Sequence, residues 1–402
     1  MMKRMLIGLL MLMFLGLVGT QLQAQPKLLI WADDTRSPVL RDVGTTFTQE
    51  TGVVVEVVEI AFADLRGQFI TTAPTGEGPD ILIGAHDWVG ELVVNGLLEP
   101  IDLGDKASAF NPVALEGFSY GGKLYGTPYG TENVALIYNK DLVSRPPQTW
   151  SDLLNMARAM TDPEKSIYGY IVQNPDPYHW FPVLSACGGY IFGTRPDGSL
   201  DPSDIGLATE GAIRGARLFD SMVEQGLLPA GVDWDTMTGL FFGGKAGMVI
   251  SGPWLLGGAK SAGINYGVAA IPSIQCPNGA HSVPRPFIGV QGFMVSAFSQ
   301  NKTLAFDFLL NYVATTETML ELFNRDPRPP AYLPAFREVA SDPDIAAFGG
   351  QATVGIPMPN IPEMASVWGA WADAQDLIAT QQADPAVALR NAVEQIRAAL
   401  GL

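Results

Sequence analysis

The sequence has few of the side chains from which most metal and nucleophilic sites are built. Its 402 residues include two cysteines and three histidines, which are Cys187, Cys276, His86, His179 and His281. No HExxH, CxxC, GxSxG or phosphate-loop pattern is present. We therefore expect neither a His/Cys metal site nor a bound cofactor. Two cysteines are also too few for a disulfide-built scaffold, and their spacing leaves open whether they pair.

Positive charge is scarce as well. The chain carries 24 Lys and Arg against 41 Asp and Glu, which gives a formal net charge of -17. Such a chain repels nucleic acid and anionic lipid surfaces, so we expect neither as a partner. The acidic surface also argues against an anionic solute, unless a local basic pocket reverses the field.

Long apolar runs are missing except near the start of the chain. After Met-Met-Lys-Arg, an apolar stretch extends from Met5 to Val18, and small Ala24 follows at a cleavage position. This stretch is shorter than the roughly 20 residues that span a membrane. We expect residues 1–24 to be a signal peptide, with an uncleaved anchor as the alternative. Because the first cysteine is Cys187, no lipid-anchor cysteine follows the signal, and we expect an exported, soluble protein of the periplasm or envelope exterior.

What the sequence does contain is an alternation of β-branched runs and helical patterns. Strands are expected at Leu28 to Trp31, Val53 to Ile60 and Asp80 to Ile83, with Ser37 as the N-cap of the first intervening helix and Pro38 as its first residue. This order predicts a βαβαβ half, an α/β fold and, at this length, two domains. Further strands are expected at 135–138, 168–172, 247–250, 266–270 and 292–296, and further helices at 209–225, 302–312, 317–324, 363–380 and 385–400.

Carboxylates and aromatic rings recur where predicted strands end. Asp34 follows the first strand, and Asp87 and Trp88 follow the third, at the edge where parallel sheets gather ligands. A pyranose has apolar faces that stack on flat rings and hydroxyls that need directional partners such as carboxylates. The set therefore favours a sugar-binding groove. The same mixture recurs at 131–133, 176–180, 251–254 and 358–368.

Each of these residues also has a structural interpretation. Asp34 and Asp87 are placed to cap helix N-termini, and the tryptophans can pack in a core. His86 and His179 are better explained as hydrogen-bonded structural residues than as general bases. The functional signal lies in the combination of segments, not in any single member.

Several short segments carry a family resemblance. They are Gly78 to Ile81 with Ala85 to Asp87, Tyr138 to Asp141, Ser251 to Trp254, Arg285 to Val290, and Met358 to Pro362. With these segments the chain resembles the maltose- and maltodextrin-binding proteins of bacterial ABC importers, from about Lys27 to the carboxyl terminus. The resemblance implies a two-lobed α/β periplasmic-binding-protein fold with three inter-lobe crossings and a ligand cleft between the lobes. It places 25–131 plus 289–341 in an amino-terminal lobe, and 132–288 plus 342–402 in a carboxyl-terminal lobe.

The resemblance also implies roles for individual residues. Asp34 and Asp87 would accept sugar hydroxyls from the amino-terminal lobe, and Glu132 would do so at the first crossing. Trp254 and Trp368 would be the stacking rings. The residues that face the first lobe from the second would be Asp176, Tyr178, Trp254 and Trp368.

The chain departs from the enteric form of that family at several positions. The enteric form has tryptophan in place of Gly84, arginine in place of Trp88, an arginine near Ala372 and a lysine near Thr35 and Arg36. Arg36 would compensate for that lysine. Because these changes alter which hydroxyls are read, maltose, maltotriose and trehalose cannot be ranked from the sequence.

The predicted function is that of a monomeric, non-enzymatic receptor. It would close around a maltodextrin by a hinge motion and deliver it to ABC permease subunits, a partner that rests on the resemblance. One alternative is a glycoside hydrolase that uses two of Asp87, Glu132 and Asp176 as acid and base. The other keeps the binding fold and changes the cargo to an oligosaccharide of another linkage, trehalose or a polyol.

Overall fold

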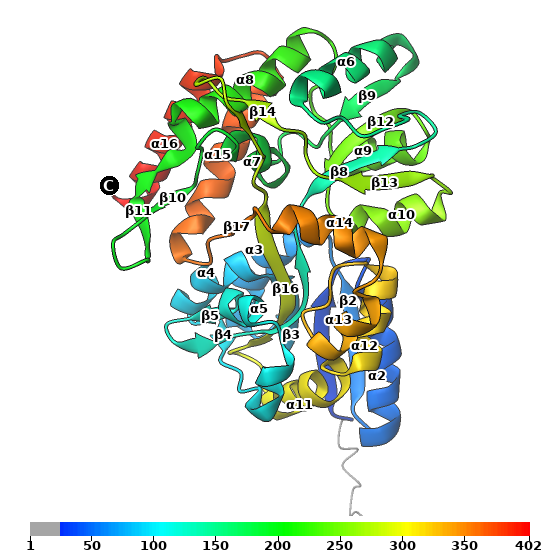
Figure 1. The fold of residues 1–402 in the computed structure, drawn as a ribbon. Helices are drawn as coiled ribbons and strands as arrows, with labels where there is room; N and C mark the ends of the chain where they lie inside the picture. Colours follow the sequence, from blue (N-terminus) through cyan, green and yellow to red (C-terminus); the bar gives the residue numbers. More distant parts are fainter. Residues whose placement is uncertain (1–24) are drawn as a thin grey trace, which may run out of the picture.

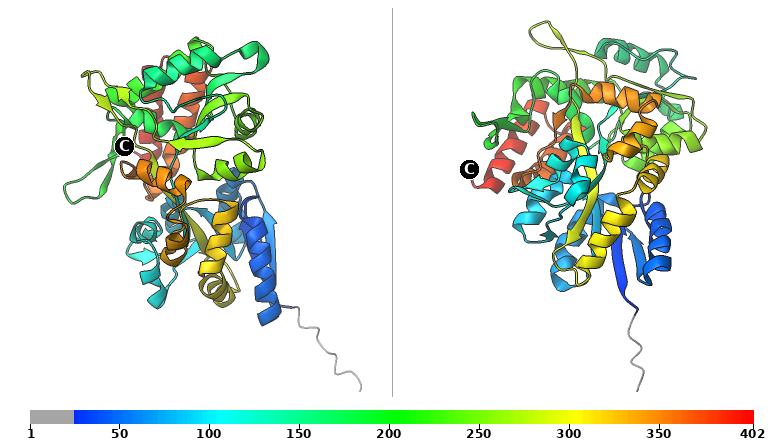
Figure 2. Two further views of the ribbon diagram at one scale, coloured as in Figure 1. Left: turned by 45° about the vertical axis from the view of Figure 1, so that its right-hand side comes forward. Right: turned by 60° about the horizontal axis from the view of Figure 1, so that its bottom comes forward.

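The computed structural model describes residues 25–402, and the predicted signal peptide lies outside them. The chain forms two separate main sheets with helices around each (Figure 1). The order of the first sheet is β17-β16-β3-β1-β2, and that of the second is β13-β8-β12-β9. The two further views keep these sheets in distinct parts of the molecule (Figure 2). The predicted two-lobed α/β fold is confirmed.

The first three strands form the expected βαβαβ unit. Strands β1 (Lys27–Ala32), β2 (Val54–Glu59) and β3 (Ile81–Ala85) are parallel, with helices α2 (Ser37–Thr51) and α3 (Phe62–Thr72) between them. Their burial differs because β3 lies inside the sheet with all five residues buried, whereas β2 is an edge strand. This unit directs the ends of β1 and β3 toward the other lobe.

The predicted N-cap of the first helix is wrong. Arg36 holds the N-cap position of α2, and its side chain makes no capping hydrogen bond. The backbone N–H of Ser37 instead donates to the Asp33 carbonyl at 2.9 Å. The helix therefore begins on a tight turn anchored by Asp33, while Pro38 lies in the first turn as predicted.

Strand β16 (Phe287–Ser296) is the longest strand and holds the first sheet together. It pairs antiparallel with β3, β7 (Thr127–Glu132) and β4 (Leu98–Glu99), and parallel with β17 (Ile356–Pro357). Only its second half, 292–296, was predicted. The earlier half was missed because Gly289 and Gln291 interrupt the apolar pattern that marks a buried strand.

The second sheet contains the four later strands, as predicted. They are β8 (Ala135–Asn139), β9 (Tyr168–Ile171), β12 (Ala246–Ser251) and β13 (Tyr266–Ala269). The amphipathic helix α8 (Glu210–Glu224) and the last two helices, α15 (Ala365–Ala379) and α16 (Pro385–Leu400), pack against one another in this lobe. Helices α6 (Trp150–Met160), α7 (Pro177–Ser185) and α9 (Trp234–Phe242) were not predicted.

The remaining elements are short. Where a helix was predicted over 302–312, the chain forms α11 (Lys302–Asp307) and then π-helical turns over Phe308–Val313. The other helices and longer hairpin strands are α4 (Val89–Val94), α5 (Pro112–Gly117), α10 (Leu256–Ser261), α12 (Thr316–Arg325), α13 (Leu333–Val339), α14 (Pro343–Ala352), β10 (Phe192–Thr194) and β11 (Leu200–Ile205).

Each main sheet has its own hydrophobic core. One core is built from buried side chains between residues 28 and 129 and between 290 and 335, and the other from residues 134 to 287 and 348 to 396. Cys187 and Cys276 belong to the second lobe and form a disulfide, with their Cα atoms 5.5 Å apart. Within residues 25–402, no helix is both long and apolar enough to cross a membrane.

Candidate functional site

The end of β1 carries two consecutive acids with different surroundings. Asp33 is buried, and its carboxylate accepts the backbone N–H of Arg36 at 3.2 Å and lies 2.8 Å from the Arg36 guanidinium. Asp34, the predicted sugar acceptor, is exposed. Arg36 is 1% exposed and also lies 3.5 Å from Asp326. The first acid is therefore structural, and the second is the one that solvent can reach.

Asp87 lies after β3 and makes a direct contact with the other lobe. Its Oδ2 accepts a hydrogen bond of 3.0 Å from Nε1 of Trp368, which lies on α15. Burial raises the pKa of Asp87 above its ordinary value, and the Trp368 hydrogen bond acts in the opposite direction. A ligand hydroxyl that donates a hydrogen bond to this carboxylate would stabilise its buried negative charge.

Trp88 is buried in the first lobe beside Asp87. Its ring lies 5.1 Å from that of Phe62, and a side chain at Gly84 would collide with it. Arg36 covers the Phe62 ring, with Cζ 5.3 Å from the ring centroid. Two of the predicted site residues, Arg36 and Trp88, are thus linked through a phenylalanine that was not predicted.

Glu132 ends β7 with both carboxylate oxygens engaged. Oε1 accepts a hydrogen bond of 3.0 Å from Nε2 of Gln291, and Oε2 accepts one from Nε of Arg328. Arg328 also pairs through Nη1 with Asp326. Gln291, Asp326 and Arg328 were all missed, because none of them lies in a local motif and their contacts join segments far apart in the sequence.

The second lobe contributes a group of rings around helix α7. Asp176 caps this helix, accepting the backbone N–H of His179 at 3.1 Å, and its other oxygen lies 3.0 Å from Nδ1 of the same residue. The His179 ring meets the Trp254 ring edge-on at 5.8 Å. Tyr178 lies 6.0 Å from Trp254, so the predicted Asp176, Tyr178 and Trp254 form one cluster.

Phe287 joins this group to Trp368. Its ring centroid lies 5.9 Å from that of Tyr178 and 6.1 Å from that of Trp368. Burial raises the pKa of Tyr178 well above its usual value, so its hydroxyl stays protonated. That hydroxyl is enclosed yet has no protein partner within the described chain, which leaves a hydrogen-bond donor without an acceptor.

The two lobes meet at a second pair of residues as well. Cζ of Arg328, from the first lobe, lies 5.1 Å from the ring centroid of Trp254, from the second. Contacts therefore run without a break from Asp87 through Trp368, Phe287, Tyr178, Trp254 and Arg328 to Glu132. The structure brings together acids and flat rings from positions 87 to 368. Of the nine predicted site residues, Asp34, Arg36 and Trp88 have no described side-chain contact with a member of this run, and Asp176 reaches it only through His179.

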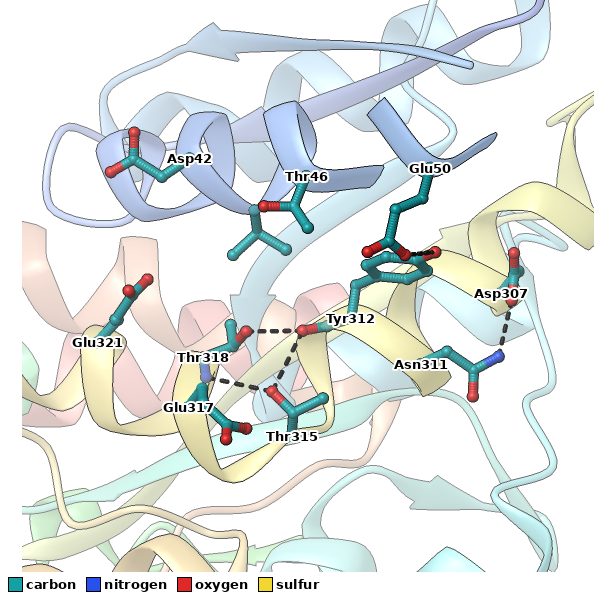
Figure 3. A pocket seen from close by; sticks show the side chains of 11 residues that line it. Asp42, Thr46, Glu50, Asp307, Asn311, Tyr312, Thr315, Glu317, Thr318 and Glu321 are labelled. Atoms are coloured by element: carbon teal, nitrogen blue, oxygen red, sulfur yellow. Dashed lines mark hydrogen bonds between the residues drawn. The ribbon is translucent and has the colours of Figure 1, made fainter. Parts of the chain in front are cut away.

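Two other features bear on what the site does chemically. Across residues 25–402 there is no group of three His, Cys, Asp or Glu side chains close enough to hold a metal ion. A separate surface hollow of about 530 Å³ lies between α2 and the helices around Tyr312, and Asp42, Glu50 and Glu321 are among its lining residues (Figure 3). It lies within the first lobe and includes none of the predicted site residues.

Comparison with known proteins identifies the class to which this fold and site belong. Residues 43–350 match the family described as bacterial extracellular solute-binding protein, and the chain belongs to that family. The predicted resemblance to solute-binding proteins is thereby confirmed.

Individual relatives cover most of the chain. The chain is 34% identical over 381 residues to the galactooligosaccharide-binding protein of Bacillus subtilis (strain 168), which covers 92% of this chain and 88% of that protein. It is 33% identical over 355 residues to the maltotriose-binding protein of Pyrococcus abyssi (strain GE5 / Orsay), which covers 85% and 75%. It is 29% identical over 351 residues to a maltodextrin-binding protein of Bacillus subtilis (strain 168), which covers 85% and 82%.

Proposed function

We propose that this protein is an oligosaccharide receptor that binds maltotriose-type α-glucosides between its lobes and does not transform them. The observation that carries the proposal is the run of contacts from Asp87 to Glu132, in which carboxylates of one lobe face flat rings of the other. Rings stack on the apolar faces of a pyranose, and carboxylates accept its hydroxyls. The names of the maltotriose- and maltodextrin-binding relatives support an α-glucoside as the cargo.

Individual roles follow from position. Asp87 and Glu132 would accept hydroxyls, Asp34 would do so from the exposed edge, and Tyr178 would donate through its unpartnered hydroxyl. Trp254 and Trp368, both half-buried, would stack on sugar units. The structure supports indirect roles for the others, because Arg36 and Trp88 are buried around Phe62 and Asp176 is bonded to α7.

The two lobes would close by rotating about the segments where the chain passes from one hydrophobic core to the other. The chain leaves one core and enters the other between 129 and 134, between 287 and 290, and between 335 and 348, which supports the three crossings and the lobe boundaries predicted at 131, 288 and 341. Sugar that touches both lobes stabilises only the closed form. Small-angle scattering would show compaction on addition of the bound sugar; an unchanged radius of gyration would contradict hinge closure.

A second cargo has a specific observation in its favour. The galactooligosaccharide-binding relative is 34% identical and covers 92% of the chain, so a galactooligosaccharide competes with an α-glucoside as the ligand. The two sugars differ in linkage and in the orientation of one hydroxyl. They therefore need different acceptor positions around the same rings.

Isothermal titration calorimetry against a matched panel tests the proposal. The panel contains maltose, maltotriose, maltotetraose, trehalose, β-galactotriose and sorbitol, each added to the chain without residues 1–24. We expect saturable binding that is tightest for maltotriose or maltotetraose. Tighter binding of β-galactotriose would establish the second cargo, and the absence of binding to any member would overturn the receptor function.

The same proposal includes an exported, monomeric protein that delivers sugar to ABC permease subunits. Export rests on residues 1–24 and on the family, and the permease rests on a relative named as the solute-binding lipoprotein of a maltooligosaccharide ABC transporter. A glycoside hydrolase is disfavoured because the chain belongs to a family of solute-binding proteins and its relatives are named for sugar binding. Reducing sugar released from maltotriose, at a rate abolished in Glu132→Gln, would reverse this conclusion.

A further inference from the structure

Arg328 is the one cation that the structure places against a ring of the opposite lobe at the candidate site, among residues 25–402. None of the sugar-binding roles proposed above involves its side chain. Its position follows from backbone pairing, because Gly130 and Pro330 form an antiparallel bridge and the N–H of Thr131 donates to the Pro329 carbonyl at 2.9 Å. Two residues further along this register, Arg328 lies opposite Glu132.

The surroundings leave little freedom to the Arg328 side chain. A Cβ on Gly130 would lie 2.9 Å from the Arg328 Cβ, so the arginine packs directly on bare backbone of β7. Its Nε and Nη1 are taken by Glu132 and Asp326, and the side chain is 7% exposed. A guanidinium held at two of its three nitrogens is pre-organised, so presenting the third to a ligand costs little rotamer entropy.

The third nitrogen, Nη2, is the free one. Within the described chain it makes no hydrogen bond, and it is not among the side-chain nitrogens that are sealed from solvent without a partner. The guanidinium faces the Trp254 ring across the lobe boundary at 5.1 Å. The free N–H groups therefore lie beside the surface on which a sugar would stack.

Charge balance indicates what kind of ligand suits this donor. The buried chain of charges contains the cations Arg36 and Arg328 and the carboxylates of Asp33, Asp326 and Glu132. The carboxylates outnumber the cations, so there is no surplus positive charge for an anionic sugar. A neutral hydroxyl or ring oxygen can accept from Nη2 without adding charge.

We propose that Arg328 is a further sugar-contacting residue, whose Nη2 donates a hydrogen bond to a hydroxyl of the neutral sugar unit stacked on Trp254. The inference rests on the proposed receptor function and adds a donor to a site otherwise described by acceptors and rings. The same guanidinium lies over the Trp254 ring at the lobe boundary, beside the position that the stacked sugar unit would occupy.

Calorimetry on Arg328→Met and Arg328→Lys tests this, with the tightest sugar of the panel as the probe. Hydrogen bonds to charged groups contribute about 1.5 to 3 kcal/mol, which corresponds to about a 10- to 100-fold loss of affinity for Arg328→Met. Arg328→Lys keeps the charge beside Glu132 and Asp326 and loses the fixed fork, so we expect an intermediate loss. Arg325→Met is the matched control, because Arg325 is half exposed and pairs with Asp42 at 3.6 Å.

Monodeoxy derivatives of the same sugar, each lacking one hydroxyl, test whether Arg328 contacts the sugar directly or only positions other residues. For the wild type, one derivative should bind about 10-fold or more weakly than the intact sugar, because it lacks the hydroxyl that Arg328 contacts. For Arg328→Met, that derivative and the intact sugar should bind with equal affinity. If every deoxy position costs the variant as much as the wild type, or if Arg328→Met binds within twofold of wild type, the inference is wrong.

Two further comparisons distinguish a failure of this inference from a folding defect and from a failure of the receptor function. Should Arg328→Met fail to fold because Glu132 loses its partner, Glu132→Gln with Arg328→Met removes both charges and is compared with Glu132→Gln alone. A wild-type protein that binds no member of the panel would instead overturn the receptor function on which the inference rests.

Discussion

The two facing surfaces of the molecule are built from different chemistry. The first lobe presents charge, with Asp87, Glu132 and Arg328 at its edge and Asp326 and Arg36 behind them. The second presents rings, namely Tyr178, His179, Trp254, Phe287 and Trp368. Each charge of the first lobe needs a partner to be tolerated in a dry site, whereas rings need only packing.

The disulfide between Cys187 and Cys276 cross-links only the lobe that carries the rings. Cys187 and Cys276 are 89 residues apart in sequence, and closing a loop of that size restricts the unfolded chain. We expect Cys187→Ser with Cys276→Ser to lose about 3 to 4 kcal/mol of unfolding free energy. Urea unfolding followed by tryptophan fluorescence measures it. A change smaller than about 1 kcal/mol would mean that the ring lobe is held by its core alone.

Removing a ring should affect binding more than folding. Trp254→Ala should weaken sugar binding by about 1 to 3 kcal/mol, as for other aromatic stacking platforms. Trp254 is only half-buried, so the thermal midpoint of the unliganded protein should change little. Calorimetry and differential scanning fluorimetry on the same preparation separate the two effects. A large loss of unliganded stability would show that Trp254 serves mainly to hold the lobes together.

Removing the Asp87 charge, unlike removing the Trp254 ring, should change the stability of the unliganded protein. Burial raises the pKa of Asp87, so the folded state binds a proton more tightly than the unfolded state does. Stability from this group is therefore lost as pH rises from its ordinary value near 3.8 through the raised value. Asp87→Asn should make stability less dependent on pH above 3.8 and raise the thermal midpoint at pH 7, while weakening sugar binding.

The measurement is a series of thermal midpoints between pH 4 and pH 7.5 for wild type and Asp87→Asn. Asp152 offers a control, since its pKa is lowered by Arg145 at the surface, far from this site. Because a group with a lowered pKa loses its contribution to stability only below the ordinary value near 3.8, the difference in thermal midpoint between wild type and Asp152→Asn should stay nearly constant over this range. Parallel curves for wild type and Asp87→Asn would show that the Asp87 carboxylate is not penalised by its burial.

The fold could be predicted because its signals are local. The βαβαβ unit, the second sheet and helix α8 follow from apolar periodicity and from turn residues. The missed helix α7 contains Pro182 and a run of aromatic residues with no clear helical stripe. Its start was nevertheless encoded at Asp176, whose carboxylate caps the helix.

The site could be predicted only where one segment carries a recognisable combination. Trp254 and Trp368 were found this way, and the structure places them in the same contact network as Asp87 and Glu132. Arg328 was not found, because its meaning comes from a strand partner 196 residues away in sequence. Sequence spacing does not distinguish Asp33 from Asp34 either, whereas the structure shows that Asp33 is buried and Asp34 is exposed.

Gly289 lies where strand β16 passes from one core to the other, between Phe287 in the second and Val290 in the first. A Cβ there would lie 2.8 Å from Cγ of Glu132 and 3.2 Å from the Tyr178 hydroxyl. Under the proposed closure, a rotation about Gly289 would move the Glu132 carboxylate relative to the Tyr178 phenol. The angle between the lobes would then set the distance between two groups proposed to hold the sugar.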